Sequence, residues 1–525
     1  MANAPFKLRD DYWEIFQLES KDLEFLYNHL LELEIPLTSL ELTEALVTQR
    51  IEQEILSIQN RQMADGKIYL PKEQYEPGDN LFFPALDWQK GKVINVRDGT
   101  NPNFEAFQVI ELEMLGGTHR EFAAGLPEHK LNQPVELAID DTLLDYETVM
   151  ARYGPELVAK LDKALEDNQD LVRIAARWFP TALLVDVNIG HLNLAEAALD
   201  MVGGGPLFTR DLLDQIELPT DVNTKLTEFS LNYALQEDQR FDEVGAAGEV
   251  VWYLNRLEPD AVRETPRYLQ FSAQNYDRSA LTETMVELEE QLDDDLVKFE
   301  SQPAKLKEAT ISLIYPHWRS GTIPLTKKTM SLFPTAFESP RIRFTLIDAD
   351  SGDKFPGWVV RNSRYIFGLS DWYKDQGVIP GSLIHIEKGK KPGEVFIQAE
   401  KRRSNREWIR TILVGADGGI VFAMLKQMVT AAFDERMAIA VPDVDSIDQV
   451  WKRSSNQKST LLQSVLFMMR ELAKLNTQGH VHAQELYAAL NVIRRCPPAP
   501  LLTLLSTQTA FIHVGDLYFR LDEDQ

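Results

Sequence analysis

The spacing of apolar residues changes several times along the chain, and each change marks a predicted module. Between 21 and 59 apolar side chains recur every three or four positions, with a break at 35–39, and an alternating strand, G-K-I-Y-L, follows. Two helices and a strand in this order predict a winged-helix module over 1–74, with Ser39 as the cap of its second helix. An ordinary helical hairpin before a strand fits the segment equally well.

Short strands separated by turn residues replace this pattern at 75–134, which predicts a small SH3-like β-barrel. Residues 135–190 have the pattern of a helical connector. From 191 to 262 a helix, the turn G-G-G-P, two further helices and two strand-like pieces follow one another. This order predicts a second winged-helix module.

The second half of the chain also divides into helical and strand-rich segments. Residues 263–307 contain a run of seven carboxylates and predict an acidic helical linker with a solvated face, although an interaction surface is the less common alternative. Strands dominate 308–405, and a connector spans 406–454. Three helices and a closing strand pair predict a further winged helix over 455–525. The predicted fold class is therefore multidomain α+β.

The module at 191–262 resembles the HARE helix-turn-helix domain, a winged-helix family found in the delta subunit of bacterial RNA polymerase, in chromatin proteins and fused to restriction enzymes. The resemblance rests on a first helix at 194–202, a P-x-x-T start of the second helix at 206–209 and the wing R-F-D-E-V-G at 240–245. The third helix, expected at 222–235, offers a single lysine among carboxylates. We therefore expect this module to contact a partner protein or to space domains, although winged helices normally read a DNA groove.

Residues 323–388 resemble the B-three DNA-binding pseudobarrel of plant transcription factors, which is related to the effector-reading domains of some bacterial restriction enzymes. The resemblance is carried by I-P-L-T-K-K, the strand R-F-T-L-I-D, G-W-V-V at 357–360, R-Y-I-F-G-L and P-G-S-L-I-H-I. It implies a pseudobarrel over 308–405 whose two arms place basic residues in the major groove; chance similarity among short strands is the alternative. The implied arm residues are Lys327, Lys328, Arg361 and Arg364.

Charge is distributed unevenly among the modules. The chain has 525 residues, and 54 Lys and Arg against 81 Asp and Glu give a formal charge of -27, which argues against binding nucleic acid through bulk charge. Between Thr310 and Thr411, however, 17 basic residues stand against 10 acidic ones, a net of +7 that leaves -34 for the rest. Two clusters at predicted strand ends are expected to meet phosphates. They are Lys388, Lys390 and Lys391, and Lys401, Arg402 and Arg403.

Residues that could carry catalysis or bind a metal form no recognisable motif. There is no G-x-S-x-G elbow and no convincing nuclease motif, and the spacing of the carboxylates singles out no acid and base pair. With the single cysteine Cys496 the chain can form no internal disulfide, and neither a signal peptide nor an apolar span is recognisable. We expect a cytoplasmic protein without catalysis, metal or cofactor.

Together these patterns predict a non-catalytic DNA-binding protein that acts in transcription regulation or in a defence-associated system. The basic pseudobarrel would hold double-stranded DNA, and the acidic winged helices would contact a protein such as RNA polymerase or a defence enzyme. The alternative is a scaffold or adaptor in which every module binds protein or a small ligand. No membrane partner is expected.

Overall fold

The structure is a computed structural model, and it divides into two compact units, Met1–Leu184 and Val185–Gln525. Both units mix helices with β-sheets, as the sequence predicts. Among the residues described, no helix is long and apolar enough to cross a membrane. The structure describes residues 8, 11–64, 66–83, 86, 89–101, 106–114, 117–132, 142–216, 218, 223–298, 305–416, 418–456 and 460–522.

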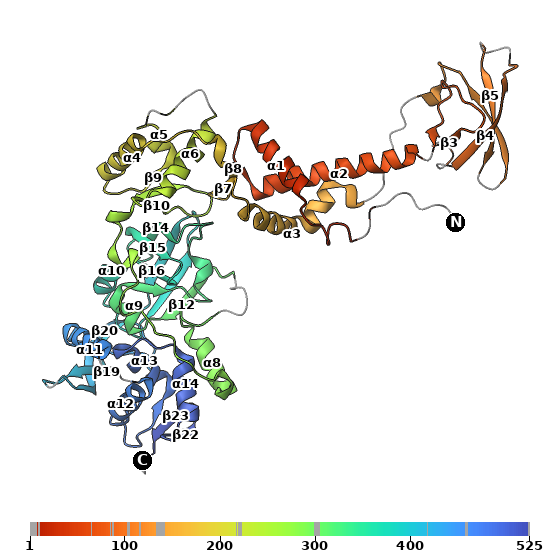
Figure 1. Ribbon diagram of the computed structural model, residues 1–525. Helices are drawn as coiled ribbons and strands as arrows, with labels where there is room; N and C mark the ends of the chain where they lie inside the picture. Colours follow the sequence, from red (N-terminus) through yellow and green to blue (C-terminus); the bar gives the residue numbers. More distant parts are fainter. Residues whose placement is uncertain are drawn as a thin grey trace. The chain divides into compact units, whose positions relative to one another are not determined.

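The first unit contains three helices and a small three-stranded sheet (Figure 1). In this sheet β8 lies between β1 and β7, and both pairings are antiparallel. Leu26, Leu46, Leu161 and Trp178 are buried apolar residues of these elements. The elements are α1 (Ser20–Leu33), β1 (Leu37–Thr38), α2 (Ser39–Ala64), α3 (Tyr146–Glu166), β7 (Leu171–Ile174) and β8 (Arg177–Pro180).

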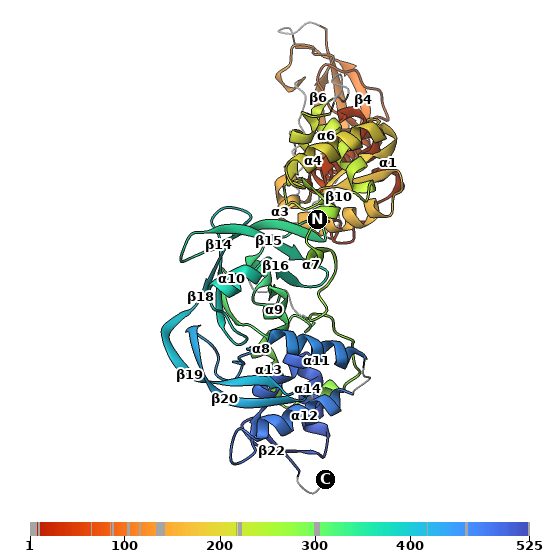
Figure 2. The ribbon, with the colours of Figure 1, turned by 90° about the vertical axis from the view of Figure 1, so that its left-hand side faces the viewer.

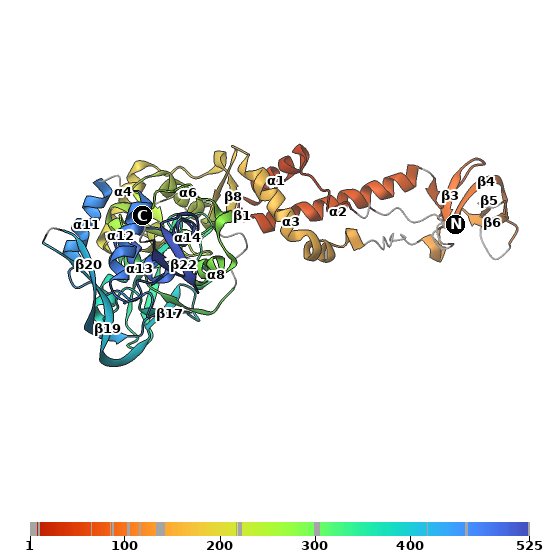
Figure 3. The ribbon, with the colours of Figure 1, turned by 90° about the horizontal axis from the view of Figure 1, so that it is seen from below.

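A second sheet is inserted in the chain between α2 and α3. Its strands follow one another in sequence order, and Leu81, Ile110 and Leu112 belong to a core of its own. Figure 3 shows α2 leading toward it, and most of it occupies the segment in which the sequence predicts a small barrel. The strands are β2 (Lys67–Ile68), β3 (Asn80–Phe83), β4 (Gln89–Asp98), β5 (Gln108–Met114) and β6 (His119–Ala124).

The helix and hairpin that follow this inserted sheet complete the fold of the first helices. Leu37 of β1 pairs with Trp178 of β8, and α3 packs against α2. Residues 146–180 therefore belong to the same small sheet and helix bundle as residues 20–64, instead of only connecting two modules. The local pattern of apolar residues does not show this, because the pairing partners are separated by a complete sheet.

The cap of α2 lies one residue before the predicted one. The Glu41 N–H donates to Thr38 Oγ1 at 3.2 Å, and the Thr38 N–H donates to Glu41 Oε2 at 2.7 Å. This reciprocal pair is a capping box. The Ser39 hydroxyl instead donates to the Asp162 carboxylate of α3. The prediction of Ser39 as the cap is wrong because its hydroxyl makes a tertiary contact.

The second unit begins with another module of three helices and a three-stranded sheet. Here β11 lies between β9 and β10, and Leu199, Leu212, Leu235 and Trp252 lie in the core. The helices and strands lie close to the positions predicted for 191–262, although Val222, the expected start of the third helix, lies outside the described residues. The elements are α4 (Ile189–Met201), β9 (Leu207–Phe208), α5 (Thr209–Leu213), α6 (Thr224–Glu237), β10 (Phe241–Glu243) and β11 (Val251–Leu254).

A seven-stranded sheet with two short helices follows, after α7 (Asp260–Arg263) and α8 (Glu283–Leu292) (Figure 2). The strand order is β12-β17-β18-β14-β15-β16-β13, and only β14 and β18 pair in parallel. The elements are β12 (Glu308–Ser312), α9 (Tyr315–Ser320), β13 (Thr322–Pro324), β14 (Arg341–Asp348), β15 (Lys354–Val360), β16 (Tyr365–Phe367), α10 (Ser370–Asp375), β17 (Leu383–Lys388) and β18 (Glu394–Ala399).

A long two-stranded ribbon and α11 lead from this sheet to the last module. The ribbon consists of β19 (Lys401–Val414) and β20 (Ile420–Ala431), and α11 spans Val444–Asn456. In the last module β23 lies between β21 and β22. Its elements are α12 (Leu461–Ala473), β21 (Val481–His482), α13 (Ala483–Ile493), α14 (Pro498–Thr507), β22 (Phe511–Gly515) and β23 (Tyr518–Leu521).

Three modules of the chain thus share one topology: helix, two-residue strand, two helices and a hairpin whose last strand pairs with the first. In the first module the Trp178 indole N–H donates to Ser39 Oγ at 3.0 Å, and Ser39 donates to Asp162. In the second, the Trp252 indole N–H donates to Asn232 Oδ1 at 2.9 Å, and Thr209 donates to the same oxygen. Both triads join equivalent positions at the start of the second helix, in the third helix and in the last strand.

The last module replaces this polar triad by an apolar one. The equivalent positions are Ala483, Leu502 and Phe519, all of which are buried. Because a buried indole N–H needs an acceptor and a buried hydroxyl needs a partner, the three positions have to change together. The covariation within one chain supports a common origin for the three modules.

The second module carries a half-buried carboxyl, Glu243, at the end of β10. Burial, with Asp242 and Glu338 nearby, raises the pKa of Glu243 to about 8. Between the unfolded value of about 4.3 and 8 the folded state therefore holds a proton that the unfolded state has lost, so this group makes stability fall as pH rises through that range.

We expect Glu243→Gln to remove this dependence, because an amide oxygen can still accept from the Gly245 N–H, which lies 2.9 Å from Glu243 Oε1. The variant should lose less stability than the parent between about pH 5 and 8, by about 1 kcal/mol after allowance for partial exposure, in urea unfolding. Glu249→Gln, an exposed change in the turn between β10 and β11, is the control. Equal pH slopes for parent and Glu243→Gln would contradict the expectation.

Candidate functional site

Strand directions determine which of the predicted DNA-contacting residues lie together. β14 and β18 run parallel, while β15 and β17 run antiparallel to them. The end of the sheet at which β14 and β18 begin therefore also carries the β15–β16 turn and the β17–β18 turn. Lys388 ends β17, and Lys390 and Lys391 lie in the turn that follows it, whereas Lys401 follows β18 at the opposite end. The two predicted lysine clusters do not converge.

Five exposed lysines gather where β12, β17 and β18 meet at this end of the sheet, which we call the lysine end. The Lys388 N–H donates to the Lys307 carbonyl at 2.9 Å, and this hydrogen bond holds the two segments of the chain side by side. None of the five forms an ion pair within 4.0 Å with a described residue, although Glu308 and Glu387 lie opposite one another beside them. The lysine end consists of Lys305, Lys307, Lys388, Lys390 and Lys391.

Two of these lysines are missed by the sequence analysis. Lys305 and Lys307 fall in the segment assigned to the acidic linker, yet Lys307 immediately precedes β12. The signal that could have identified them is the L-K-E-A-T-I-S pattern, which starts an alternating strand at Glu308. The predicted module boundary after residue 307 therefore separates these two lysines from the other residues of the lysine end.

The second predicted cluster is paired with carboxylates. Lys401 Nζ lies 2.7 Å from Asp350 Oδ2, and Arg402 Nη2 lies 3.7 Å from Glu407 Oε1. Because Lys401 donates to it, the pKa of the Asp350 carboxyl lies below its usual range. The backbone of Arg403 lies in β19, but its side chain is outside the described part of the structure. This cluster has less free positive charge than the lysine end.

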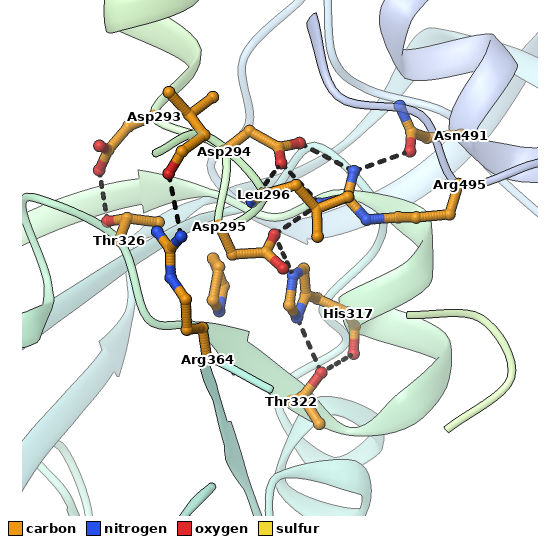
Figure 4. Close-up of polar contacts among 12 residues, drawn as sticks. Asp293, Asp294, Asp295, Leu296, His317, Thr322, Thr326, Arg364, Asn491 and Arg495 are labelled. Carbon is orange, nitrogen blue, oxygen red and sulfur yellow. Dashed lines mark hydrogen bonds and ion pairs between the residues drawn. The ribbon is translucent and has the colours of Figure 1, made fainter. Parts of the chain in front are cut away.

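The two predicted arms lie at the same end as the five lysines, but only part of each arm faces solvent. Lys327 is exposed, whereas Lys328 Nζ donates to the Gln291 carbonyl in the last turn of α8 at 3.3 Å. Arg361 Nη1 donates to the Ser339 carbonyl at 2.9 Å. Arg364 Nη1 donates to the Val297 carbonyl at 2.9 Å (Figure 4). DNA contact by these four residues stays a prediction.

The acidic segment after α8 explains why Arg364 turns inward. Arg364 has φ 57°, a left-handed conformation, and its side chain is half-buried near the carboxylates that begin at Asp293. Burial lowers the pKa of its guanidinium, and those carboxylates oppose the shift. Asp293 also accepts a hydrogen bond from the Thr326 hydroxyl. The segment thus packs against both arms of the sheet module.

The prediction of a solvated acidic face is wrong for part of this segment. Asp294 and Asp295 are each 3% exposed, and Arg495, 2% exposed, binds both of them (Figure 4). The guanidinium is 2.7 Å from Asp294 Oδ1 through Nη2, 2.8 Å from Asp294 Oδ2 through Nη1, and 2.6 Å from Asp295 Oδ1. We call Asp294, Asp295, Arg495 and His317 the buried ion cluster.

This cluster joins the sheet module to the last three-helix module. His317 of α9 lies 3.0 Å from Asp295 Oδ1 through Nε2, and the Tyr487 hydroxyl of α13 donates to Asp294. Burial alone would raise the pKa of Asp295, but Arg495 and His317 outweigh burial and hold it below its usual range. Every ionised group in the cluster has a partner of opposite charge or a hydrogen bond. The arrangement therefore serves structure rather than proton transfer.

A cavity of about 180 Å³ lies beside the buried ion cluster. It is bordered by Asp293, Lys328, Asp434 and Gln484, among others. Among the described residues no group of three or more His, Cys, Asp or Glu side chains could hold a metal ion. The cavity offers mixed charges without a coordinating set.

No protein-family model, characterised protein or solved structure matches the chain.

Proposed function

We propose that the protein binds double-stranded DNA without catalysis, and that the lysine end of the seven-stranded module, a B-three-like pseudobarrel, holds the duplex. The proposal rests on one observation: five exposed lysines on adjacent chain segments that form no ion pair within 4.0 Å with described residues. Lys327 adds a further exposed cation at the same end of the sheet. Such a group can meet consecutive phosphates and release their counterions.

The acidity of the rest of the chain favours DNA binding that is confined to the lysine end. With +7 in the segment Thr310–Thr411 and -34 elsewhere, the rest of the chain should repel DNA that approaches it. Binding then depends on a small number of lysine contacts and responds steeply to salt.

We further propose that the three repeated modules are winged helices that contact protein instead of DNA. The third helix of the last module, α14, has no charged residue, and seven of its ten residues are buried. In the second module α6 carries Lys225 against Glu228 and Glu237. A third helix that reads a major groove needs exposed donors for base edges and phosphates. RNA polymerase or a defence-system enzyme in the cytoplasm is the kind of partner that this arrangement fits, in transcription regulation or defence.

The test is a charge reversal at the lysine end. We expect Lys388→Glu, Lys390→Glu and Lys391→Glu together to weaken binding to a labelled duplex at least about tenfold at about 0.1 M salt, because three phosphate contacts are lost. The slope of log affinity against log salt should fall by about 2.7. Fluorescence anisotropy over a salt series measures both quantities.

The matched control reverses three exposed lysines of the first unit, Lys72, Lys130 and Lys163, and so changes the net charge equally. If this control weakens binding as much as the lysine-end variant, bulk charge and not the lysine end is responsible. If the parent protein does not bind duplex even at about 50 mM salt, the scaffold alternative replaces DNA binding.

A further inference from the structure

The ribbon of β19 and β20 carries an aromatic side chain that is mostly exposed to solvent. Trp408 is 61% exposed and Met428 is 66% exposed, whereas Trp358 and Trp372 of the seven-stranded sheet module are buried. Figure 2 shows the ribbon as a long curved pair of strands. Tryptophan is enriched at binding interfaces, because its ring is apolar and its N–H is polar, so this exposed ring is a candidate for ligand contact.

Strand register places two cations beside these residues. Trp408 pairs with Lys426, and Arg406 pairs with Met428, so all four side chains project from one face of the ribbon. The cations occupy one diagonal of this quartet, and the two apolar side chains occupy the other. Lys426 Nζ lies 5.3 Å from the Trp408 ring centroid.

The charges of the quartet are not neutralised within the described structure. Neither Arg406 nor Lys426 forms an ion pair within 4.0 Å with a described residue. Glu407, the neighbour of both Arg406 and Trp408 in β19, projects from the opposite face because neighbouring residues of a strand alternate. Further along the same face Ile412 and Phe422 are buried in the core of the last module, so the quartet is the solvated half of a ribbon that is anchored at its other half.

We propose that this quartet binds single-stranded nucleic acid, with a base stacked on Trp408 and the flanking phosphates on Arg406 and Lys426. Alternation of a ring and a cation on an open strand face suits a chain that alternates bases and phosphates. In a duplex the base faces are already stacked on each other and cannot reach the indole ring. An acidic peptide would use the two cations and leave the ring in water.

The site is distinct from the lysine end, because β19 begins at the opposite end of β18. Single-strand binding at the quartet therefore goes beyond the proposed duplex binding, and each proposal can be tested without the other. A protein with both sites would hold duplex at one surface and an unpaired strand at another.

The experiment compares two labelled strands of about twelve units, oligothymidine and an abasic strand with the same phosphates. We expect Trp408→Ala to weaken oligothymidine binding by about tenfold, a factor that one stacked base can supply, and to leave the abasic strand unchanged. Trp408→Phe, which keeps a ring, should retain most of the affinity. Val421→Ala, an exposed change on the opposite face of the ribbon, is the matched control.

Three outcomes overturn the inference. Trp408→Ala could leave oligothymidine binding unchanged, it could weaken the abasic strand equally, or a polyglutamate peptide could bind with the same dependence on Trp408. The lysine-end triple variant separates this site from the duplex site. It should lose duplex binding and keep the Trp408-dependent binding of oligothymidine, and Trp408→Ala should show the reverse.

Discussion

Replacing Arg495 by Met is expected to destabilise the last module by about 3–5 kcal/mol, the largest effect of any single substitution considered for this protein. Arg495 is the one buried cation that binds both Asp294 and Asp295. Without it the two carboxylates stay buried with only His317, the Tyr487 hydroxyl and the Leu296 N–H as described side-chain or backbone partners, and the methionine side chain cannot replace the hydrogen bonds of the guanidinium. Hydrogen exchange of the α13 amides in a urea series measures the local free energy of unfolding.

The effect should depend on pH with a defined sign. In the parent protein the pKa of Asp295 is lowered, so its contribution is complete above the unfolded value of about 3.9 and is lost only as pH falls through the folded value. In Arg495→Met the burial of Asp295 is no longer outweighed by the guanidinium and raises the folded pKa of this carboxyl, so the variant regains stability as pH falls from 7 toward 5.

Two variants make the result specific. Arg520→Met removes an exposed arginine of β23 in the same module and should change stability by less than about 0.5 kcal/mol. Adding Asp294→Asn and Asp295→Asn to Arg495→Met should recover part of the loss, because the uncompensated charges are removed. A loss no larger than that of Arg520→Met would show that the buried ion cluster contributes little.

The second large effect concerns the polar triad of the second module. Asn232→Leu leaves the Thr209 hydroxyl buried without its acceptor and leaves the Trp252 N–H with only the longer hydrogen bond to Thr209 Oγ1 at 3.3 Å. The variant should therefore destabilise the module by about 1–3 kcal/mol. Trp252→Phe and Thr209→Ala should each also be destabilising. The triple variant carries the combination found at Ala483, Leu502 and Phe519, and it leaves no polar side chain of the triad unpaired.

We therefore expect the triple variant to lose at least about 1 kcal/mol less than the sum of the three single losses, measured by urea unfolding. The same cycle at Ser39, Asp162 and Trp178 provides an independent replicate in the first module. Additive losses in both modules would show that the triads are not interchangeable units and would weaken the argument for a common origin.

The parts of the fold that follow from local pattern were predicted correctly. The helices and strands of 191–262 and of 455–525 follow from apolar spacing, because each module folds from one continuous segment. The fold of the first module could not be predicted from apolar spacing, because its third helix and hairpin come after the inserted sheet. The cap of α2 was displaced by one residue because Ser39 has a distant partner in Asp162.

The candidate site was predicted in part for a similar reason. The turn lysines from 388 to 391 follow from sequence, but burial of Asp294 depends on Arg495, two hundred and one positions later. An acidic run with few basic residues beside it in sequence is expected to be solvated. Partners so distant in the chain cannot be read from composition or periodicity.

The insertion of a complete sheet between α2 and α3 has a consequence for synthesis. When α1, β1 and α2 leave the ribosome, their partners α3, β7 and β8 have not yet been made, whereas the inserted strands β2 to β6 can pair with one another as soon as they emerge. The inserted sheet is thus expected to fold before the module that encloses it. Because the entropic cost of loop closure grows with the length of the flexible chain, an insert that is already folded makes the later closure less costly than a loose chain of that length.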